Sequence, residues 1–502
     1  MKVKEKLTMP RVSPVADAAS VSTTPGTDGA VSKTVSDVLK RIGDDSACFV
    51  ATAPGRLDVM GGFAEYSGAL VLNRTLGDHV CVAVQARRDG NISITSATPS
   101  EGGATNKISV SRLCESNGRK ESALTRHGSD GPVRGDLATC ALGGLAEALH
   151  AQLLPTVPGG LSICVGSSLP EGNGNGRNAA AAAATIVACA AALDRALEPL
   201  AVATVCQRVE NHWLSAPVGI ADAVCALVGE PDTLLEVRCE PCSLGGSIRL
   251  PEDLLLLGID CGNTQADAAE RYAHVRTAAF MGRMLIDRII MHDRARQGST
   301  PTANLAANQI GNQISWDGYL SRLSSNDYVD RFRDRIPKII KGQEFLDRFG
   351  ETGDPLTRID PSGVYKVRSR TEHHVYEHAR SRQFVECFSR AIRGSERKSL
   401  EEAGEVMNAS HWSYGQRCGL GSIETDLLVN LIRQHGAEAD VFGAKITGRG
   451  CGGVVAVLLK SNEQALSAIE SAMNDYQSRT GYTPRLLRGS TPGALVSGTQ
   501  RV

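Results

Sequence analysis

The sequence lacks the features that would place this protein in or on a membrane. No run of about 18 apolar residues occurs, the length that a membrane-spanning helix requires, and the N-terminus has no apolar core typical of a secretory signal. A surplus of charge is also missing, because 54 Lys and Arg residues balance 55 Asp and Glu residues. We therefore expect a soluble, cytoplasmic protein with no nucleic-acid or membrane partner.

The 14 cysteines lack the pattern of a disulfide framework or a zinc site. Most lie in apolar segments, which favours reduced and buried thiols. Cys239 and Cys242 form a C-x-x-C pair without a second pair, so a zinc or redox site is not expected. His374 and His378 lie four residues apart, but the Glu of H-E-x-x-H and a third ligand are missing, and we expect a surface helix here.

A chain of 502 residues is long enough for two or three domains. Residues 1–45 have no sustained hydrophobic period and predict a disordered tail. Strand and helix patterns alternate beyond the tail and predict two lobes, residues 46–250 and 251–502. Polar surface insertions are expected at 97–136, with a short strand at 107–110, and at 295–317. The expected strands are 79–85, 161–165, 254–260 and 454–459, and the expected helices are 136–151 and 201–214.

The most informative segment joins the apolar strand at 161–165 to an Ala-rich helix. The connecting loop contains Gly172, Gly174 and Gly176. Glycines let backbone N–H groups approach an anion, and the first turn of a helix adds unpaired N–H groups and the positive end of its dipole. The segment therefore predicts a loop that binds the phosphates of a nucleotide.

Two common nucleotide-binding classes fit this loop poorly. A P-loop nucleoside triphosphatase needs Lys-Ser or Lys-Thr after the last glycine, and this pair is absent. Residues 174–179 satisfy G-x-G-x-x-A, which is typical of dinucleotide-binding folds. However, Pro170 and Glu171 separate the strand from the glycines, and no acidic strand end follows at the required distance. A dinucleotide-dependent oxidoreductase stays as a third alternative.

Two further glycine-rich segments flank this loop. The first runs from Ala53 to Gly68 (APGRLDVMGGFAEYSG), and the second runs from Gly443 to Gly453 (GAKITGRGCGG). In this order and at these separations, the three segments resemble the three motifs of the GHMP small-molecule kinases. The form of the first motif is most similar to plant-type L-arabinokinases and to galactokinase-like sugar kinases. The resemblance covers about residues 49–495.

This resemblance implies an α+β, two-lobed GHMP kinase fold. The N-lobe would be ribosomal-protein-like, with a five-stranded mixed sheet, and the C-lobe would have a four-stranded antiparallel sheet backed by helices. The implied activity is ATP-dependent phosphorylation of the anomeric hydroxyl of a free monosaccharide, with L-arabinose as the expected sugar and ATP and Mg²⁺ as cofactors. A monomer or homodimer is expected.

The resemblance also implies roles for individual residues. Asp222 would accept the proton of the sugar hydroxyl, and Arg56 would lie beside the nucleophile and the γ-phosphate. The residues expected to bind the sugar are Glu65, Asp58, Gly62 and Tyr66. The residues expected to bind ATP are Pro170, Gly172, Gly174, Gly176, Arg177, Asn178, Ala179, Gly448 and Gly450. Glu210 and Asn178 are expected to bind magnesium.

The chain departs from the family pattern where the family handles the triphosphate and its metal. Three serines of the family's central motif are replaced by Gly176, Arg177 and Asn178, and Arg449 stands where small residues are usual. A second interpretation is therefore a catalytically impaired GHMP pseudokinase that acts as a sugar-binding or nucleotide-binding sensor or scaffold.

Overall fold

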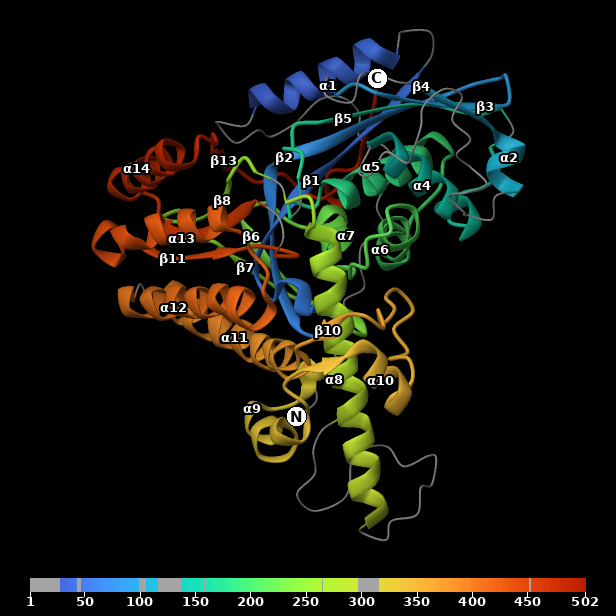
Figure 1. The fold of residues 1–502 in the computed structure, drawn as a ribbon. Coiled ribbons are helices and arrows are strands. Elements are labelled where there is room, and N and C mark those ends of the chain that lie inside the picture. Colours follow the sequence, from blue (N-terminus) through green and yellow to red (C-terminus); the bar gives the residue numbers. More distant parts are fainter. Residues whose placement is uncertain are drawn as a thin grey trace, which may run out of the picture.

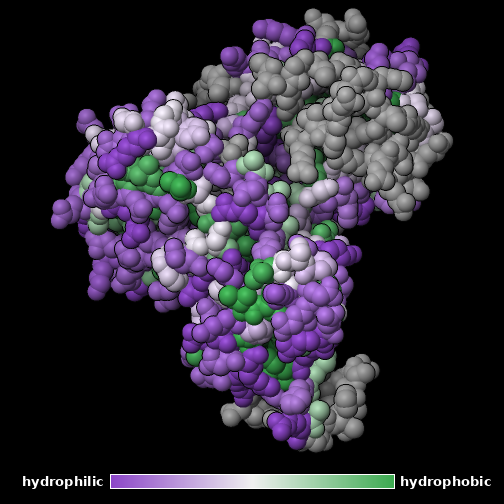
Figure 2. All heavy atoms as spheres, viewed as in Figure 1, coloured by the Kyte–Doolittle hydropathy of each residue, from purple (hydrophilic) through white to green (hydrophobic). Residues whose placement is uncertain are grey.

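The computed structural model describes residues 28–42, 47–98, 105–115, 137–157, 159–172, 174–263, 265–296, 316–394, 396–450 and 453–502. Within these ranges the chain forms two large sheets, a two-stranded sheet (Ile340–Lys341 with Val364–Tyr365) and several groups of helices (Figure 1). No helix in the described ranges combines the length and the apolar character needed to cross a membrane. Figure 2 shows a mainly hydrophilic face on which apolar residues gather in small groups, one of them near α8 and β10.

The larger sheet is mixed and has eight strands. Its order is β14-β1-β2-β5-β3-β4, and a β6-β7 hairpin joins it through β2; only the β3-β5 pair is parallel. Because β2 is 17 residues long, its first part pairs with β6 and its last part with β5. The strands are β1 (Cys48–Met60), β2 (Leu70–Ala86), β3 (Asn91–Ser96), β4 (Thr105–Ser109), β5 (Gly160–Ser167), β6 (Thr233–Cys239), β7 (Cys242–Arg249) and β14 (Thr499–Arg501).

Both faces of this sheet are covered because successive residues of a strand point to opposite sides. In β1, Ala51 and Ala53 belong to the main core, whereas Cys48 and Val50 contact a second cluster around Val38 of α1 (Asp28–Ile42). The helices on the main-core side are α4 (Leu137–His150), α5 (Arg177–Ala192), α6 (Pro199–Arg208), α7 (Ala221–Val228) and α15 (Ala494–Ser497). A π-helical turn, η3 (Val209–Trp213), follows α6, and the short α2 (Val110–Glu115) follows β4.

The smaller sheet is antiparallel, in the order β11-β12-β8-β13. One face packs against α13 and α14, and the other joins the main core together with α11 and α12. Its strands are β8 (Leu254–Asp260), β11 (Val441–Ile446), β12 (Val454–Lys460) and β13 (Arg485–Leu487). The helices of this part are α11 (Val367–Gly394), α12 (Arg397–Ser413), α13 (Ile423–His435) and α14 (Glu463–Thr480).

The long helix α8 (Ala268–Arg296) projects away from both sheets and carries a separate aromatic-rich core (Figure 1). The short elements packed around it include α9 (Ser325–Asp327), α10 (Gly342–Phe349), β9 (Ile340–Lys341) and β10 (Val364–Tyr365). The 3₁₀ turn η1 (Gly62–Ser67) and the π-turn η7 (Tyr414–Cys418) also contribute to this core.

The α+β class, the two-sheet fold and the four-stranded antiparallel sheet confirm the expectations from the sequence. The expected five-stranded sheet is wrong, because this sheet has eight strands within the described residues. The predicted disordered tail is wrong for residues 28–42, since α1 buries Val38 against the sheet. Residues 1–27 and 43–45 of that tail lie outside the described residues, as do 99–104, 116–136 and 297–315 of the two predicted insertions.

The surface helix expected around His374 is also a wrong prediction. The side chain of His374 is fully buried, because α11 packs against α8, α12 and β2. Its Nε2 lies 3.0 Å from the Tyr66 hydroxyl and its Nδ1 lies 3.0 Å from Ser67 Oγ. His378 Nδ1 accepts a hydrogen bond from the backbone N–H of Leu70. Both imidazoles are therefore structural.

The contact between α12 and β11 depends on two facing glycines, which predicts a strong stability effect. A Cβ at Gly404 would lie 2.0 Å from the carbonyl oxygen of Phe442. We expect Gly404→Ala to lower the free energy of unfolding by about 1–3 kcal/mol, since the backbones must separate. Urea denaturation measures this, with Gly246→Ala as control because its Cβ would meet no atom within 4 Å. Equal stability of the two variants would contradict the predicted close packing.

Candidate active site

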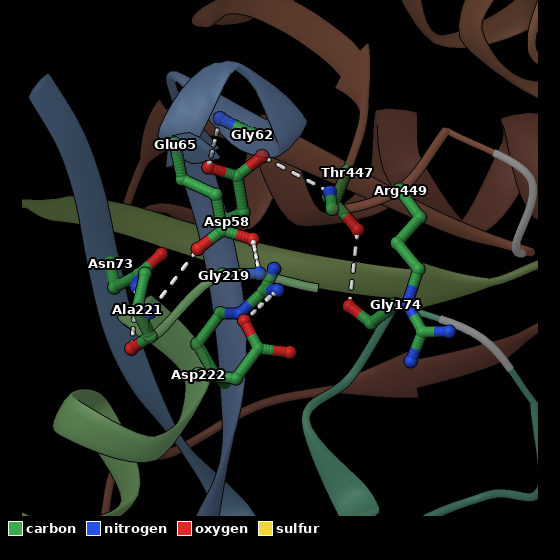
Figure 3. Close-up of polar contacts among 12 residues, drawn as sticks. Asp58, Gly62, Glu65, Asn73, Gly174, Gly219, Ala221, Asp222, Thr447 and Arg449 are labelled. Carbon is green, nitrogen blue, oxygen red and sulfur yellow. Dashed lines mark hydrogen bonds and ion pairs between the residues drawn. The ribbon is translucent and has the colours of Figure 1, made fainter. Parts of the chain in front are cut away.

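The three glycine-rich segments meet at one place (Figure 3). The backbone N–H of Arg56 on β1 donates to the carbonyl of Asn175, at 2.7 Å. Thr447 Oγ1, after β11, donates to the carbonyl of Gly174, at 3.3 Å. Segments that are far apart in the sequence are therefore joined by direct hydrogen bonds, as their common resemblance predicted.

Arg56 and Asp222 form a buried ion pair at this junction. The side chains are paired through Nη2 and Oδ1, and the two residues are only 5% and 8% exposed. Burial by itself lowers the pKa of Arg56, but attraction by Asp222, Asp58 and Glu65 outweighs it and raises the pKa overall. Nε and Nη1 of Arg56 have no hydrogen-bond partner within the described residues. A charged group with two buried donors is therefore available to a ligand.

Glu65 contacts the segment that carries Asp222. Its Oε1 accepts the backbone N–H of Gly219 at 3.0 Å, and its Oε2 accepts that of Ala221 at 3.1 Å. Burial, and then repulsion by Asp222, raise the pKa of the Glu65 carboxyl to about 7, although Arg56 and the two N–H groups oppose the shift. The carboxylate thus lies beside Asp222, and part of its hydrogen-bonding capacity is used within the protein.

Asp58 joins the first and third segments and also binds Gly62 within the first segment. Asp58 is fully buried; its Oδ1 accepts the N–H of Gly62 at 3.0 Å, and its Oδ2 accepts from Lys445 Nζ at 3.3 Å and from the N–H of Gly448 at 3.0 Å. A Cβ at Gly62 would lie 1.6 Å from the Tyr414 hydroxyl, so only glycine fits there. Both residues were predicted to bind the sugar, and in the structure their polar groups bind other parts of the protein.

Tyr66, another residue predicted to bind sugar, is buried in the aromatic core around α8 and α11. Its hydroxyl is hydrogen-bonded to His374, and the guanidinium of Arg276 lies 4.6 Å from the centre of its ring. Arg276 in turn pairs with Asp354 and donates to the carbonyl of Pro217, which precedes the segment contacted by Glu65. Tyr66 therefore contacts the site indirectly, through Arg276 and the backbone of Pro217.

The glycine-rich loop is organised by Asn175, a residue that the sequence interpretation missed. Its side-chain amide donates to the carbonyl of Pro170 at 2.8 Å, and its Oδ1 accepts the N–H of Arg177 at 3.2 Å. Gly174 and Gly176 have φ values of +106° and +74°, which glycine adopts without strain. The loop thus enters α5 through a left-handed glycine that offers no side chain to cap the helix.

The other predicted ATP-binding residues are spread around this entrance. Arg177 is buried and its guanidinium lies 3.8 Å from the exposed Glu171, Asn178 is half-buried, and Ala179 is fully buried in the core. Gly448 and Gly450 form the facing turn, with φ values of +56° and +70°. The exposed Gly172 lies at the outer end of the loop.

Glu210, on the π-turn η3, is the predicted magnesium ligand. Its Oε1 pairs with Arg449 Nη2 at 3.4 Å, whereas its buried Oε2 has no hydrogen-bond partner within the described residues. Burial raises the pKa of this carboxyl to about 7, with Asp222 adding to the shift and Arg449 and Arg56 opposing it. One carboxylate oxygen is therefore available and the other is shared with an arginine.

The oxygen ligands near Glu210 suit a magnesium ion that is also bound by substrate phosphates. They suit an ion bound by protein side chains alone less well. No group of three or more His, Cys, Asp or Glu side chains in the described ranges is arranged to bind a metal. Mg²⁺ usually takes one or two carboxylates together with substrate phosphates and water. Glu210 Oε2 and the half-buried Asn178 amide are suitable oxygen donors of this kind.

Tyr272, on α8, is a further site residue that the sequence interpretation did not name. Its hydroxyl is buried and has no hydrogen-bond partner within the described residues. Burial raises its pKa, and Glu65 and Asp222 add to the shift while Arg276 and Arg449 oppose it. Tyr272 lies within residues 49–495, over which the resemblance to the kinases extends, but no motif marked it in the sequence.

The buried Glu65 carboxyl predicts a pH dependence of stability. Because its pKa is raised in the folded protein, its stabilising contribution is complete at low pH and is lost as the pH rises through about 7. Glu65→Gln cannot ionise, so we expect its stability relative to wild type to increase between pH 5 and pH 8. Urea denaturation at several pH values checks this, with the exposed Glu344→Gln as control. A difference that does not change with pH would refute it.

Three segments of the chain match known protein families. Residues 136–230 match the N-terminal domain of the GHMP kinases, and residues 391–477 match their C-terminal domain. Residues 39–86 match the galactokinase galactose-binding signature. The segments include the central glycine-rich loop and the first motif.

Individual relatives of this chain are also sugar kinases by name. The L-arabinokinase of Arabidopsis thaliana is 31% identical over 493 residues, and the match covers 90% of this chain but only 47% of that protein. This chain therefore spans about half the length of that relative. The galactokinase of Candida albicans is 23% identical, and the match covers 85% of each chain.

Solved structures share the fold. Lactococcus lactis galactokinase complexed with galactose superposes with a TM-score of 0.65 at 17% identity, covering 94% of this chain and 100% of that one. A mevalonate kinase superposes with a TM-score of 0.50 at 12% identity, covering 88% and 99%. The chain therefore contains segments that match both the N-terminal and the C-terminal domain of the GHMP kinases, and it shares its fold with a galactokinase.

Proposed function

We propose that this protein is an ATP-dependent sugar kinase that phosphorylates the anomeric hydroxyl of a free monosaccharide, with L-arabinose as the first candidate. The observation that carries the proposal is the buried Arg56–Asp222 pair between the glycine-rich loop and the Gly448 turn. The sequence match to an L-arabinokinase and the galactose-binding signature support a sugar as the acceptor.

In the proposed reaction, Asp222 accepts the proton of the anomeric hydroxyl while the sugar oxygen bonds to the γ-phosphorus of ATP and the bond to ADP breaks. Arg56 lies where its free Nη1 can donate to the transferred phosphoryl group and balance its charge. The N-terminal end of α5 and the backbone N–H groups of the loop would bind the other phosphates. Tyr272 would donate to or accept from a sugar hydroxyl.

Magnesium, when bound, would neutralise charge on the phosphates and orient them. Glu210 and Asn178 are the residues proposed to hold it. Arg449 already offers a positive charge to Glu210, and the buried Arg177 stands at the start of α5. We propose that these two arginines take over part of the charge neutralisation in a chain that lacks the serines of the family pattern.

A pseudokinase is the second candidate, and the Arg449–Glu210 contact is the observation that favours it. If this pair excludes magnesium, ATP would bind without being positioned for transfer. The protein would then act as a sensor or scaffold for a sugar or nucleotide.

The first test is sugar-dependent release of ADP from magnesium-ATP. The panel contains L-arabinose, D-galactose, galacturonate and glucuronate. We expect turnover with a neutral sugar, and a loss of about 10²–10⁴-fold in kcat for Asp222→Asn because the proton acceptor is removed. Asp253→Asn, which changes an exposed carboxylate outside the site, should keep wild-type turnover. Absence of turnover in the wild-type protein, with ATP still raising its Tm, would favour the pseudokinase.

The role of Arg177 predicts a separate effect on the nucleotide. Arg177→Ser should raise the KM for ATP by about 10–150-fold, since a hydrogen bond to a charged group contributes about 1.5–3 kcal/mol. Arg195→Ser, exposed beyond the end of α5, serves as the matched control. If Arg177→Ser combined with Asn178→Ser instead increases turnover, Arg177 obstructs the metal, and the impaired relative becomes the better description.

A further inference from the structure

The backbone that leads into Asp222 is held from two sides. Glu65 accepts the N–H groups of Gly219 and Ala221, while Asn73 Nδ2 on β2 donates to the carbonyl of Ala221 at 3.2 Å (Figure 3). The backbone N–H and the backbone C=O of Ala221 are thus both bound by buried side chains. Asp222 is the next residue, in the first turn of α7.

This contact requires glycine at position 219. A Cβ built there would lie 2.3 Å from Cδ and 2.5 Å from Oε2 of Glu65. The carboxylate of Glu65 therefore packs directly on the backbone of Gly219. Glu65 is only 7% exposed. The arrangement gives the carboxylate little freedom to turn toward another group without releasing the segment.

Glu65 and Arg56 act on the same aspartate in different ways. Arg56 holds the carboxylate of Asp222 directly, and Glu65 fixes the main chain from which Asp222 projects. Arg56 lies in the middle of β1, and Glu65 lies in the turn η1 after the same strand. One strand and its connecting turn therefore determine both the position and the partner of the reacting side chain.

We propose that Glu65 is a positioning residue: it places Asp222 for proton transfer through the backbone of residues 219–221, and contact with the sugar is not its main role. This inference rests on the function proposed above. A displacement of about 1 Å at a reacting group can cost about 10²-fold in rate, so loss of the two hydrogen bonds should act on the chemical step. A carboxylate is required because both of its oxygens accept N–H groups.

The first test separates kcat from the KM for the sugar that the wild-type protein uses. Glu65→Gln keeps the size of the side chain but places an NH₂ group against one backbone N–H. We expect kcat to fall at least about tenfold while the KM for sugar changes less than about threefold. Glu236→Gln, a half-buried carboxylate on β6, is the matched control. A large rise in KM with unchanged kcat would overturn the proposal and make Glu65 a sugar contact.

The second test is a double-mutant cycle between Glu65→Ala and Gly219→Ala. In the wild-type background, the new Cβ at position 219 collides with Glu65, and kcat should fall about 10²-fold. In the Glu65→Ala background the collision is absent, so Gly219→Ala should change kcat less than about threefold. Independent, additive effects would overturn the proposal. Urea denaturation of each variant excludes unfolding as the cause.

The two proposals fail in different ways. If wild type shows no turnover with any sugar, the sugar-kinase function is refuted and the positioning role falls with it. If wild type turns over and Glu65→Gln leaves kcat unchanged, only the positioning role is refuted. Glu65→Asp adds a check on geometry, because its shorter side chain should not reach both N–H groups and should reproduce the kcat loss.

Discussion

The buried contact of Asp58 with Lys445 and Gly448 is the interaction on which the site depends. Asp58 lies on β1 of the larger sheet, and its partners lie at the end of β11 in the smaller sheet. Both charged side chains are fully buried, so removal of one partner would leave an uncompensated charge, a change that typically costs about 3–5 kcal/mol. This contact holds the third glycine-rich turn against the first glycine-rich segment.

Around this contact the site balances an unusual number of buried charges. Asp222, Glu65 and Glu210 lie close enough to influence one another, and Arg56 and Arg449 form ion pairs with Asp222 and Glu210. Burial and mutual repulsion raise the pKa of two of these carboxyls to about 7. Carboxyls with shifted pKa values cluster at functional sites, so this arrangement agrees with a role in binding or chemistry.

The glycine-rich loop before α5 shows how one motif can be built with other residues. Asn175 closes the loop with three hydrogen bonds: two from its side chain and one to its own carbonyl. The backbone conformation of Gly174 and Gly176 then opens the N-terminal end of α5 toward the facing turn. The positive charges of Arg177 and Arg449 stand nearby, in a chain without the usual serines. The backbone conformation of the loop therefore does not depend on the serines of the family pattern.

Local patterns determined much of this protein. The strands at 254–260 and 454–459, the helix after the glycine-rich loop and the three motifs could be recognised because each depends on residues close in sequence. The resemblance to the kinases also implied that Arg56 and Asp222 act at one site, and the structure places them in contact.

Contacts between distant segments were decided only by the tertiary structure. Sequence spacing could not reveal that Asp58 binds Lys445, that Glu65 binds the backbone before Asp222, or that Tyr66 and His374 are buried together. A carboxylate has the same local pattern whether it faces a ligand or a backbone N–H from another segment. Which of these it meets depends on how the sheets and helices pack, because the partners of a buried polar group come from whatever the fold places beside it.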